Sequence, residues 1–312
     1  MLNIYKTSNE GKIVEIKNIE ENCWINISNP TFEELNLVSR QCKIPFEFLE
    51  SPLDLEESAR VEYDKETNST LIINDFPIID SSNPHFDSYI TIPIGITLSA
   101  NYFITVCNQP SSLIENLIKK NVNTTMKSRF ALEILLAIST LYIENLKQLN
   151  KQRLKIEKTL RDSLTNKQLY DLMEIEKSLV YFLTSLKANG DVLRKMFLTT
   201  SVKLYDADKE LLEEVRIENT QGIETTELYT RILSSITGSY SSLISNELNN
   251  TMKTLTLFTV FLTLPTLVFS FFGMNVNLPI VAENPFSWVI TLIIALLLIM
   301  WIGLVLWRRR IV

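Results

Sequence analysis

Histidine, cysteine and glycine are scarce in this chain of 312 residues, which has one histidine, three cysteines and seven glycines. His85 stands in a polar stretch, and Cys23, Cys42 and Cys107 lie far apart without a CxxC spacing. This inventory argues against a zinc site and indicates reduced thiols in a cytosolic compartment. The glycines form no GxGxxG, Walker or GxSxG motif, so no nucleotide-phosphate site and no enzyme activity are predicted.

Charge is absent from two long stretches near the C-terminus. Residues 255–272 and 286–307 are apolar or hydroxyl-bearing and contain no Asp, Glu, Lys or Arg. About 18 residues rising 1.5 Å each match the hydrocarbon thickness of a bilayer. The sequence therefore predicts two membrane-spanning helices joined by a short loop, residues 273–285.

The basic residues of this region all stand next to the ends of the spans that lie away from the loop. Lys253 precedes the first span and Arg308, Arg309 and Arg310 follow the second, whereas the loop has one acid, Glu283, and no base. By the positive-inside rule, both termini are expected in the cytoplasm and the loop outside the plasma membrane. No signal-peptide pattern opens the chain, so the first half is expected to stay cytoplasmic.

The remainder of the chain is acidic. Residues 251–312 carry four bases and one acid, a net of +3, and the whole chain carries −6, so residues 1–250 carry −6 − 3 = −9. An acidic domain disfavours nucleic-acid binding and is compatible with binding divalent cations. A solvated surface that keeps the domain soluble explains the same charge.

Short β-rich runs separated by turn residues fill the first 108 residues. Helices are expected at 31–41 and 46–53, and turns at Asn68-Ser69 and Ala100-Asn101. The candidate strands are residues 3–6, 13–16, 24–27, 59–63, 70–76, 89–98 and 102–107.

Helix formers dominate from Ser111 onward. Apolar residues keep helical spacing over 134–156 and again over 167–188, where Asn189-Gly190 predicts a helix end. A third helical run starts near Asp191 and has no strong stop, so one helix from about residue 204 to 272 is expected to be roughly 100 Å long. Gly222 and Gly238 weaken it locally.

The predicted fold class is therefore α+β: a cytoplasmic α/β/α sandwich with long helices, followed by two C-terminal transmembrane helices. The expected divisions are 1–203 for the α/β and helical domain, 204–254 for the cytoplasmic part of the long helix and 255–272 for the first span. The loop is 273–285, the second span 286–307 and the basic tail 308–312.

One face of the long helix is polar within the membrane. Ser and Thr in a spanning helix serve helix packing, because their hydroxyls bond the carbonyl at i−4, or they line a pore built from several copies. The residues that share this face at threes and fours are Asn249, Met252, Leu255, Thr259, Thr263, Thr266 and Ser270.

Immediately outside the first span stands Gly273-Met274-Asn275. This tripeptide after a Pro-containing, Thr-rich span, with a short loop, a second span and a basic tail behind it, resembles the signature of the CorA family of magnesium channels. The resemblance covers residues 204–312 well and the first two hundred only in general pattern.

The resemblance implies a homopentamer in membrane lipid that conducts Mg²⁺, with Co²⁺ and Ni²⁺ as further candidates. It implies that Asn275 selects the ion, that the polar face lines the pore and that Arg308, Arg309 and Arg310 form a basic collar. Neutral amides can accept hydrogen bonds from the water shell of Mg²⁺, which the ion gives up reluctantly. Leu255 and Met252 would form an apolar constriction that gates the pore by dewetting. Because Thr263 stands where relatives often have Met, this gate is expected to be shifted or softer.

The family's cytoplasmic funnel is opened and closed by bound Mg²⁺, which implies carboxylates shared between subunits. A solvated helix face is the alternative for each of these acids. The first choice is Asp80 with Glu214, and the full set of candidates is Asp80, Asp87, Asp206, Glu210, Glu213 and Glu214.

Two other functions remain open. A ZntB-type zinc transporter shares the architecture, but Met274 and the scarcity of histidine count against it. A membrane-tethered sensor would use the spans only as an anchor and would carry no ion flux.

Overall fold

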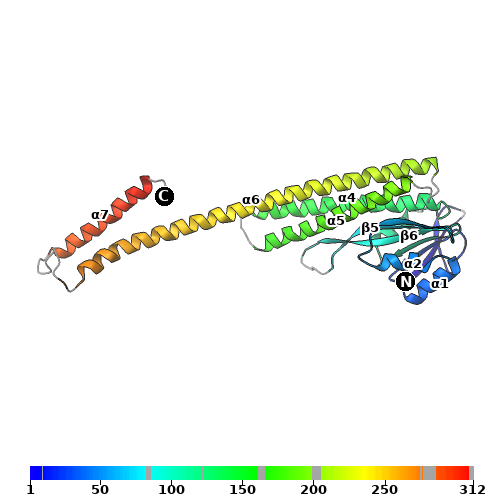
Figure 1. Cartoon of the computed structure of the whole chain (residues 1–312), viewed down its shortest axis with the longest axis horizontal. Coiled ribbons are helices and arrows are strands. Elements are labelled where there is room, and N and C mark those ends of the chain that lie inside the picture. The colour runs from blue at the N-terminus through cyan, green and yellow to red at the C-terminus, as the bar shows by residue number, and fades with distance from the viewer. Residues whose placement is uncertain are drawn as a thin grey trace. The chain divides into compact units, whose positions relative to one another are not determined.

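The computed structural model describes residues 1–312 except 9, 82–85, 121, 161–165, 199–204, 275, 277–285 and 309–312. Contacts divide the chain into two compact units, Met1–Ser235 and Ile236–Val312. The first unit holds a sheet with helices on both faces, and two long apolar helical segments occur in the second. Figure 1 shows the elements of each.

Seven strands form one mixed sheet in the order β2-β1-β3-β7-β6-β5-β4. Neighbouring strands run antiparallel except β3 and β7, which are parallel. Six of the seven predicted strands are confirmed to within one or two residues, and the fifth runs three residues further than predicted. The strands are β1 Leu2–Thr7, β2 Ile13–Ile16, β3 Trp24–Ser28, β4 Arg60–Asp64, β5 Ser69–Ile79, β6 Tyr89–Leu98 and β7 Phe103–Cys107.

Short helices cover one face of the sheet. The first, α1 (Phe32–Cys42), begins with a capping box in which Thr31 and Glu34 satisfy each other's backbone amides. The second predicted helix is divided into α2 (Phe46–Glu50) and the 3₁₀ turn η1 (Ser51–Leu53). Strand side chains and these helices share one apolar cluster that includes Ile25, Ile27, Leu35, Val38, Phe48, Leu49, Leu71, Ile73, Ile104 and Val106.

Long helices cover the other face, as Figure 1 shows for α4 (Lys127–Leu160) and α5 (Asn166–Leu198) above β5 and β6. A short helix, α3 (Ser112–Lys119), precedes them. Aromatic rings fill this interface: Phe130 stacks on Phe103 at 4.4 Å and meets Trp24 edge-on at 4.9 Å. The α/β/α sandwich predicted for this domain is confirmed.

The predicted helix end at Asn189-Gly190 is wrong, because α5 continues to Leu198. The Asn189 amide is buried and pairs with the main chain of Asp75: its Oδ1 accepts from the amide N at 2.9 Å and its Nδ2 donates to the carbonyl at 2.8 Å. A Cβ at Gly190 would lie 3.1 Å from Asn219 Nδ2. Both residues therefore serve close packing inside a helix and do not end it.

The final two helices are α6 (Asp206–Phe272) and α7 (Ser287–Arg308). The long helix is confirmed as one element of 67 residues that starts two residues after the predicted position. Within unit 1 it packs on α5, where Asn219 Nδ2 donates to the Leu186 carbonyl at 3.0 Å.

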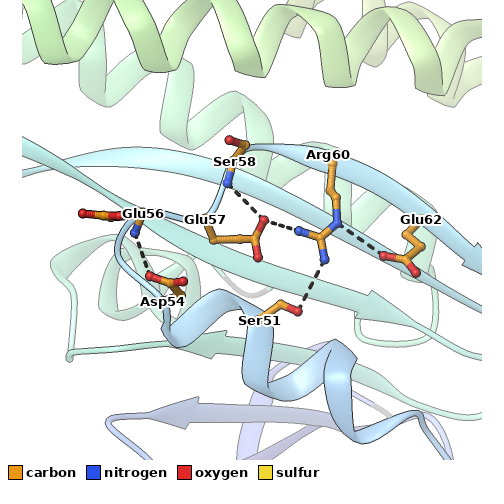
Figure 2. Close-up of polar contacts among 7 residues, drawn as sticks. All are labelled: Ser51, Asp54, Glu56, Glu57, Ser58, Arg60 and Glu62. Atoms are coloured by element: carbon orange, nitrogen blue, oxygen red, sulfur yellow. Dashed lines mark hydrogen bonds and ion pairs between the residues drawn. The ribbon is translucent and has the colours of Figure 1, made fainter.

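A salt-bridged loop connects η1 to the edge strand β4 (Figure 2). Arg60 pairs with Glu57 Oε1, with Glu62 Oε2 at 3.3 Å and with Ser51 Oγ at 3.4 Å. Asp54 Oδ1 caps the backbone amide of Glu56 at 3.0 Å. The arginine thus neutralises two carboxylates of this acidic segment, which disfavours a cation there.

Candidate functional site

Both apolar helices are long enough to cross a membrane, and their apolar windows are almost entirely exposed within the single chain. A soluble protein would bury such surfaces in its core, so this exposure favours membrane helices. They occupy the C-terminal part of α6 and the whole of α7, as the sequence predicted.

The hydroxyl face of α6 is exposed along its whole length. The side chains on this face are all exposed within the chain: Thr259, Thr263, Thr266 and Ser270, and also Asn249, Met252 and Leu255. The less exposed residues of the span are Leu257, Val260, Phe261, Leu264, Pro265, Val268 and Phe272, of which Val268 is buried. At about 100° per residue, these two sets lie on opposite sides of the helix.

Each of four threonine hydroxyls donates its proton to its own helix. Thr256 bonds the Met252 carbonyl at 2.7 Å, and Thr259 bonds that of Leu255 at 2.9 Å. Thr263 and Thr266 repeat this i−4 pattern at 2.7 and 2.8 Å. The donor is thereby used within the helix, and the oxygen lone pairs remain as acceptors on the exposed face.

The helix ends at the predicted tripeptide. Gly273 N donates to the Phe269 carbonyl at 2.9 Å, and a Cβ on Gly273 would lie 3.1 Å from that oxygen. The glycine therefore suits the close turn, while Met274 is 52% exposed. Asn275 lies outside the described residues, and so do Arg309 and Arg310; Arg308 is the last residue of α7.

Three of the six candidate regulatory acids have local side-chain partners within the chain. Asp80 is buried and pairs with Lys177 of α5, with Nζ 3.6 Å from Oδ2. Asp87 lies in the connection between β5 and β6, where its carbonyl accepts from Gln152 Nε2 at 3.3 Å. Asp206 pairs with Lys209 at 3.0 Å.

The other acids of this set lie on α6. Arg216, whose Nη2 is 2.5 Å from Glu213 Oε1, holds the pKa of Glu213 below its usual range. Glu210 and Glu214 are exposed. Within the described part of one chain, no three His, Cys, Asp or Glu side chains gather as metal ligands. The single chain therefore does not bring the candidate acids together.

Two residues that matter here were not identified from the sequence. Lys177 gives Asp80 a cationic partner, and nothing in the spacing of α5 singles it out. Asn189 anchors α5 to β5, and its signal was a polar residue beside glycine inside an otherwise apolar helical pattern. That signal favours a helix end locally, so only the tertiary contact distinguishes the two cases.

Comparisons with known proteins agree with this arrangement. The chain is 28% identical to the cobalt/magnesium transport protein CorA of Methanocaldococcus jannaschii, over 96% of each protein. It is 24% identical to the magnesium transport protein CorA of Helicobacter pylori, over 88% of this chain and 87% of that protein. The complete structure of the CorA magnesium transporter from Methanocaldococcus jannaschii matches with a TM-score of 0.85 and 25% identity, over 99% and 98% of the two chains.

The family model described as CorA-like Mg2+ transporter protein matches residues 20–310. This range contains strands β3 to β7, the long helices and both apolar spans. The chain therefore belongs to the CorA-like Mg²⁺ transporter family, whose members are membrane transporters and not enzymes.

Proposed function

We propose that this protein is a plasma-membrane channel that admits Mg²⁺ down its electrochemical gradient along the hydroxyl face of α6. Co²⁺ and Ni²⁺ are further candidate ions. The observation that carries the proposal is the exposed row of Thr259, Thr263, Thr266 and Ser270, opposite the less exposed face of the span. The names of the two CorA relatives support magnesium as the cargo.

The threonine geometry suits a hydrated cation. Mg²⁺ holds its octahedral water shell tightly, and the protons of that shell point outward. Because Thr259, Thr263 and Thr266 have donated to their own backbone, their oxygens are left to accept from those waters. A wall of acceptors can guide the ion without removing its water.

An amide ring is proposed as the filter at the outer end. Asn275 follows the close turn at Gly273 and would contribute one neutral acceptor from each copy. A neutral ring binds the hydrated ion weakly enough for release, which conduction requires. Met252 and Leu255, 54% and 60% exposed, would form an apolar constriction nearer the cytoplasmic end.

A single copy cannot enclose this pathway. The exposed hydroxyls and exposed apolar side chains of this span require either lipid or other helices around them, and one polar row is poorly suited to lipid. We propose a homopentamer with the polar rows facing a common axis. Both termini would be cytoplasmic, with Arg308, Arg309 and Arg310 as a basic collar at that end.

Gating by intracellular Mg²⁺ is proposed to use acids brought together between copies. Glu214 and Glu210 are exposed on α6 and accessible to a neighbouring copy. Asp80 already has Lys177 as its partner, so a metal at Asp80 would have to displace that lysine. Asp206 and Glu213 are weaker choices, because they are paired with Lys209 and Arg216. Asp87 is also a weaker choice.

Two alternatives make different predictions. A ZntB-like zinc transporter would move Zn²⁺ in preference to Mg²⁺, which Met274 and the single histidine of the chain disfavour. A tethered sensor without transport would show no flux and no dependence on Asn275. A single flux assay separates these outcomes.

The test is Mg²⁺ uptake into proteoliposomes with an inside-negative potential and low internal Mg²⁺. We expect wild-type flux that falls at least about tenfold, or loses its preference for Mg²⁺ over Zn²⁺, in Asn275→Ala. Asn277→Ala is the matched control and should conduct as wild type. Absence of flux in the wild type would contradict the channel and favour the sensor.

A further inference from the structure

A cavity of about 710 Å³ opens at one end of the sheet in unit 1. Its wall combines the turn between β4 and β5, the turn between β6 and β7 and the first turns of α4 and α6. This volume is typical of sites for small molecules. None of the described residues that line the cavity belongs to the proposed ion pathway or to the proposed regulatory acids, so that mechanism does not explain it.

Two cationic side chains line the wall that α4 contributes. Lys127 is partly buried, which lowers its pKa, and one of its three Nζ donors goes to the Ala100 carbonyl. Arg129 pairs its Nε with Glu133 Oε1 at 3.4 Å, and its guanidinium carries four further N–H donors. Both cations lie in the first turn of α4, which contains no acid and where the helix dipole is also positive. An anion in the cavity would accept from these donors and offset this repulsion.

Two tyrosines line the cavity from other elements. The Tyr63 hydroxyl on β4 donates to Asn68 Oδ1 at 2.8 Å, which holds its ring beside the turn that follows. Tyr205 directly precedes α6 and is 64% exposed. Exposed aromatic rings of this kind stack on flat ring systems such as nucleobases. The cavity therefore offers places for an anionic group and for an aromatic ring of one ligand.

One carboxylate also lines the cavity. Asp208 is buried, and its Oδ2 accepts from the Tyr205 amide at 3.1 Å, which is one half of a capping box at the start of α6. A carboxylate there disfavours a ligand that is anionic along its whole length. It can accept a hydrogen bond from an amino group or a ring N–H of a nucleobase. The ligand that fits has an anionic end and a neutral ring that donates hydrogen bonds.

We propose that this cavity binds a nucleoside phosphate, with the phosphate at Lys127 and Arg129 and the base against Tyr205. Inorganic phosphate alone would leave the tyrosines without a ring to stack on. An uncharged nucleoside would leave the two cations without a counterion. The inference goes beyond the proposed transport and does not depend on it, because binding is measured without any ion flux.

Isothermal titration calorimetry of the full-length protein in detergent tests the site, with AMP and UMP as purine and pyrimidine probes. We expect at least one of them to bind about tenfold more tightly than inorganic phosphate or the matching nucleoside. Lys127→Met keeps the length of the side chain and removes its charge, so nucleotide binding should weaken about tenfold or more. Lys147→Met is the matched control, because Lys147 is exposed on α4 and does not line the cavity, and it should bind as wild type.

Two further variants separate the parts of the site. Tyr205→Leu should remove the preference for nucleotide over inorganic phosphate and leave phosphate binding unchanged, because only the ring is lost. Lys127→Arg keeps the charge and should retain most of the nucleotide binding, which distinguishes a lost contact from a lost fold.

Three results would overturn the proposal. The first is that neither AMP nor UMP binds the wild type at millimolar concentration. The second is equal weakening by Lys127→Met and Lys147→Met, because the attraction would then belong to the whole surface and not to the cavity. The third is inorganic phosphate that binds the wild type as tightly as both nucleotides, because the tyrosines would then contribute nothing.

Discussion

Asp75 is a carboxylic acid that the fold disfavours in its ionised form. Burial on β5 raises its pKa to about 6, and its Oδ1 has no hydrogen-bond partner among the described residues. Since the folded pKa exceeds the unfolded one, the folded state binds the proton more tightly. Stability contributed by that proton is present below about pH 4 and is lost as the pH rises through about 6.

Asp75→Asn should therefore stabilise the protein above pH 6 and have little effect near pH 4. A shift of about two units corresponds to roughly 3 kcal/mol at most. The measurement is the melting temperature of the detergent-solubilised protein at several pH values. An effect of Asp75→Asn that does not change with pH would contradict the raised pKa of Asp75.

Asp64 is the opposite case, because hydrogen bonds from Thr67 lower its pKa. Asp64→Asn should therefore destabilise the protein at neutral pH.

Gly95 of β6 is a position where a methyl group has no room. A Cβ there would lie 2.2 Å from Pro52 Cγ in the turn η1. We expect Gly95→Ala to destabilise the protein by about 1–3 kcal/mol, the usual cost of overpacking. Adding Pro52→Ala removes the opposing ring and should recover part of the loss in melting temperature. An additive double variant would show that the two residues do not press on each other.

At the scale of elements, the joint between α5 and β5 depends on Asn189. Its amide supplies both a donor and an acceptor to Asp75, beyond the Arg60–Ile73 pair at which β4 begins. Asn189→Ala would remove the partner of the Asp75 amide and leave its carbonyl with the Tyr142 hydroxyl at 3.2 Å, so it should cost about 1–3 kcal/mol. Asn36→Ala is the control, because Asn36 bonds the Phe32 carbonyl at an exposed site and its loss should cost less than about 1 kcal/mol. Equal melting temperatures for the two variants would contradict this joint.

The elements that sequence predicted well are those whose pattern is local. Strand alternation located β6 at its full extent, Tyr89–Leu98, and a continuous lack of helix stops located α6. Asn189-Gly190 was misread because a turn signal and a tertiary hydrogen bond use the same residue types. The partner of Asp80 could not be predicted for a related reason, because Lys177 lies on a different element 97 positions away in the sequence.

The candidate pathway likewise combines a local pattern that the sequence shows with tertiary geometry that it does not show. Helical spacing alone identified the row of Thr259, Thr263, Thr266 and Ser270, and the structure adds that it is exposed and lies opposite Val268. Whether the proposed regulatory acids meet depends on surfaces contributed by several copies. Neither the sequence pattern nor the single chain contains that geometry, so those assignments remain predictions.

At the scale of the whole molecule, the proposed pentamer predicts which side of α6 meets other copies. Thr259 lies on the exposed polar row, whereas Leu297 is 56% exposed on α7 and is expected to face lipid. Each chain then offers one reactive thiol, so a short bifunctional thiol reagent should link Thr259→Cys protein into covalent dimers and leave at least about one chain in five unlinked, as an odd number of copies requires. Leu297→Cys should give little linking. The buried native thiols make wild type the blank.

A second reaction of Thr259→Cys protein distinguishes a pore from simple helix packing. If the row lines a water-filled path, Thr259→Cys should also react with a charged, membrane-impermeant thiol reagent, because only water carries that reagent to the middle of a span. Hydrated Mg²⁺ at millimolar concentration should slow this reaction severalfold by occupying the path. Cross-linking without reaction would indicate a dry helix interface, and the hydroxyls would then serve packing alone.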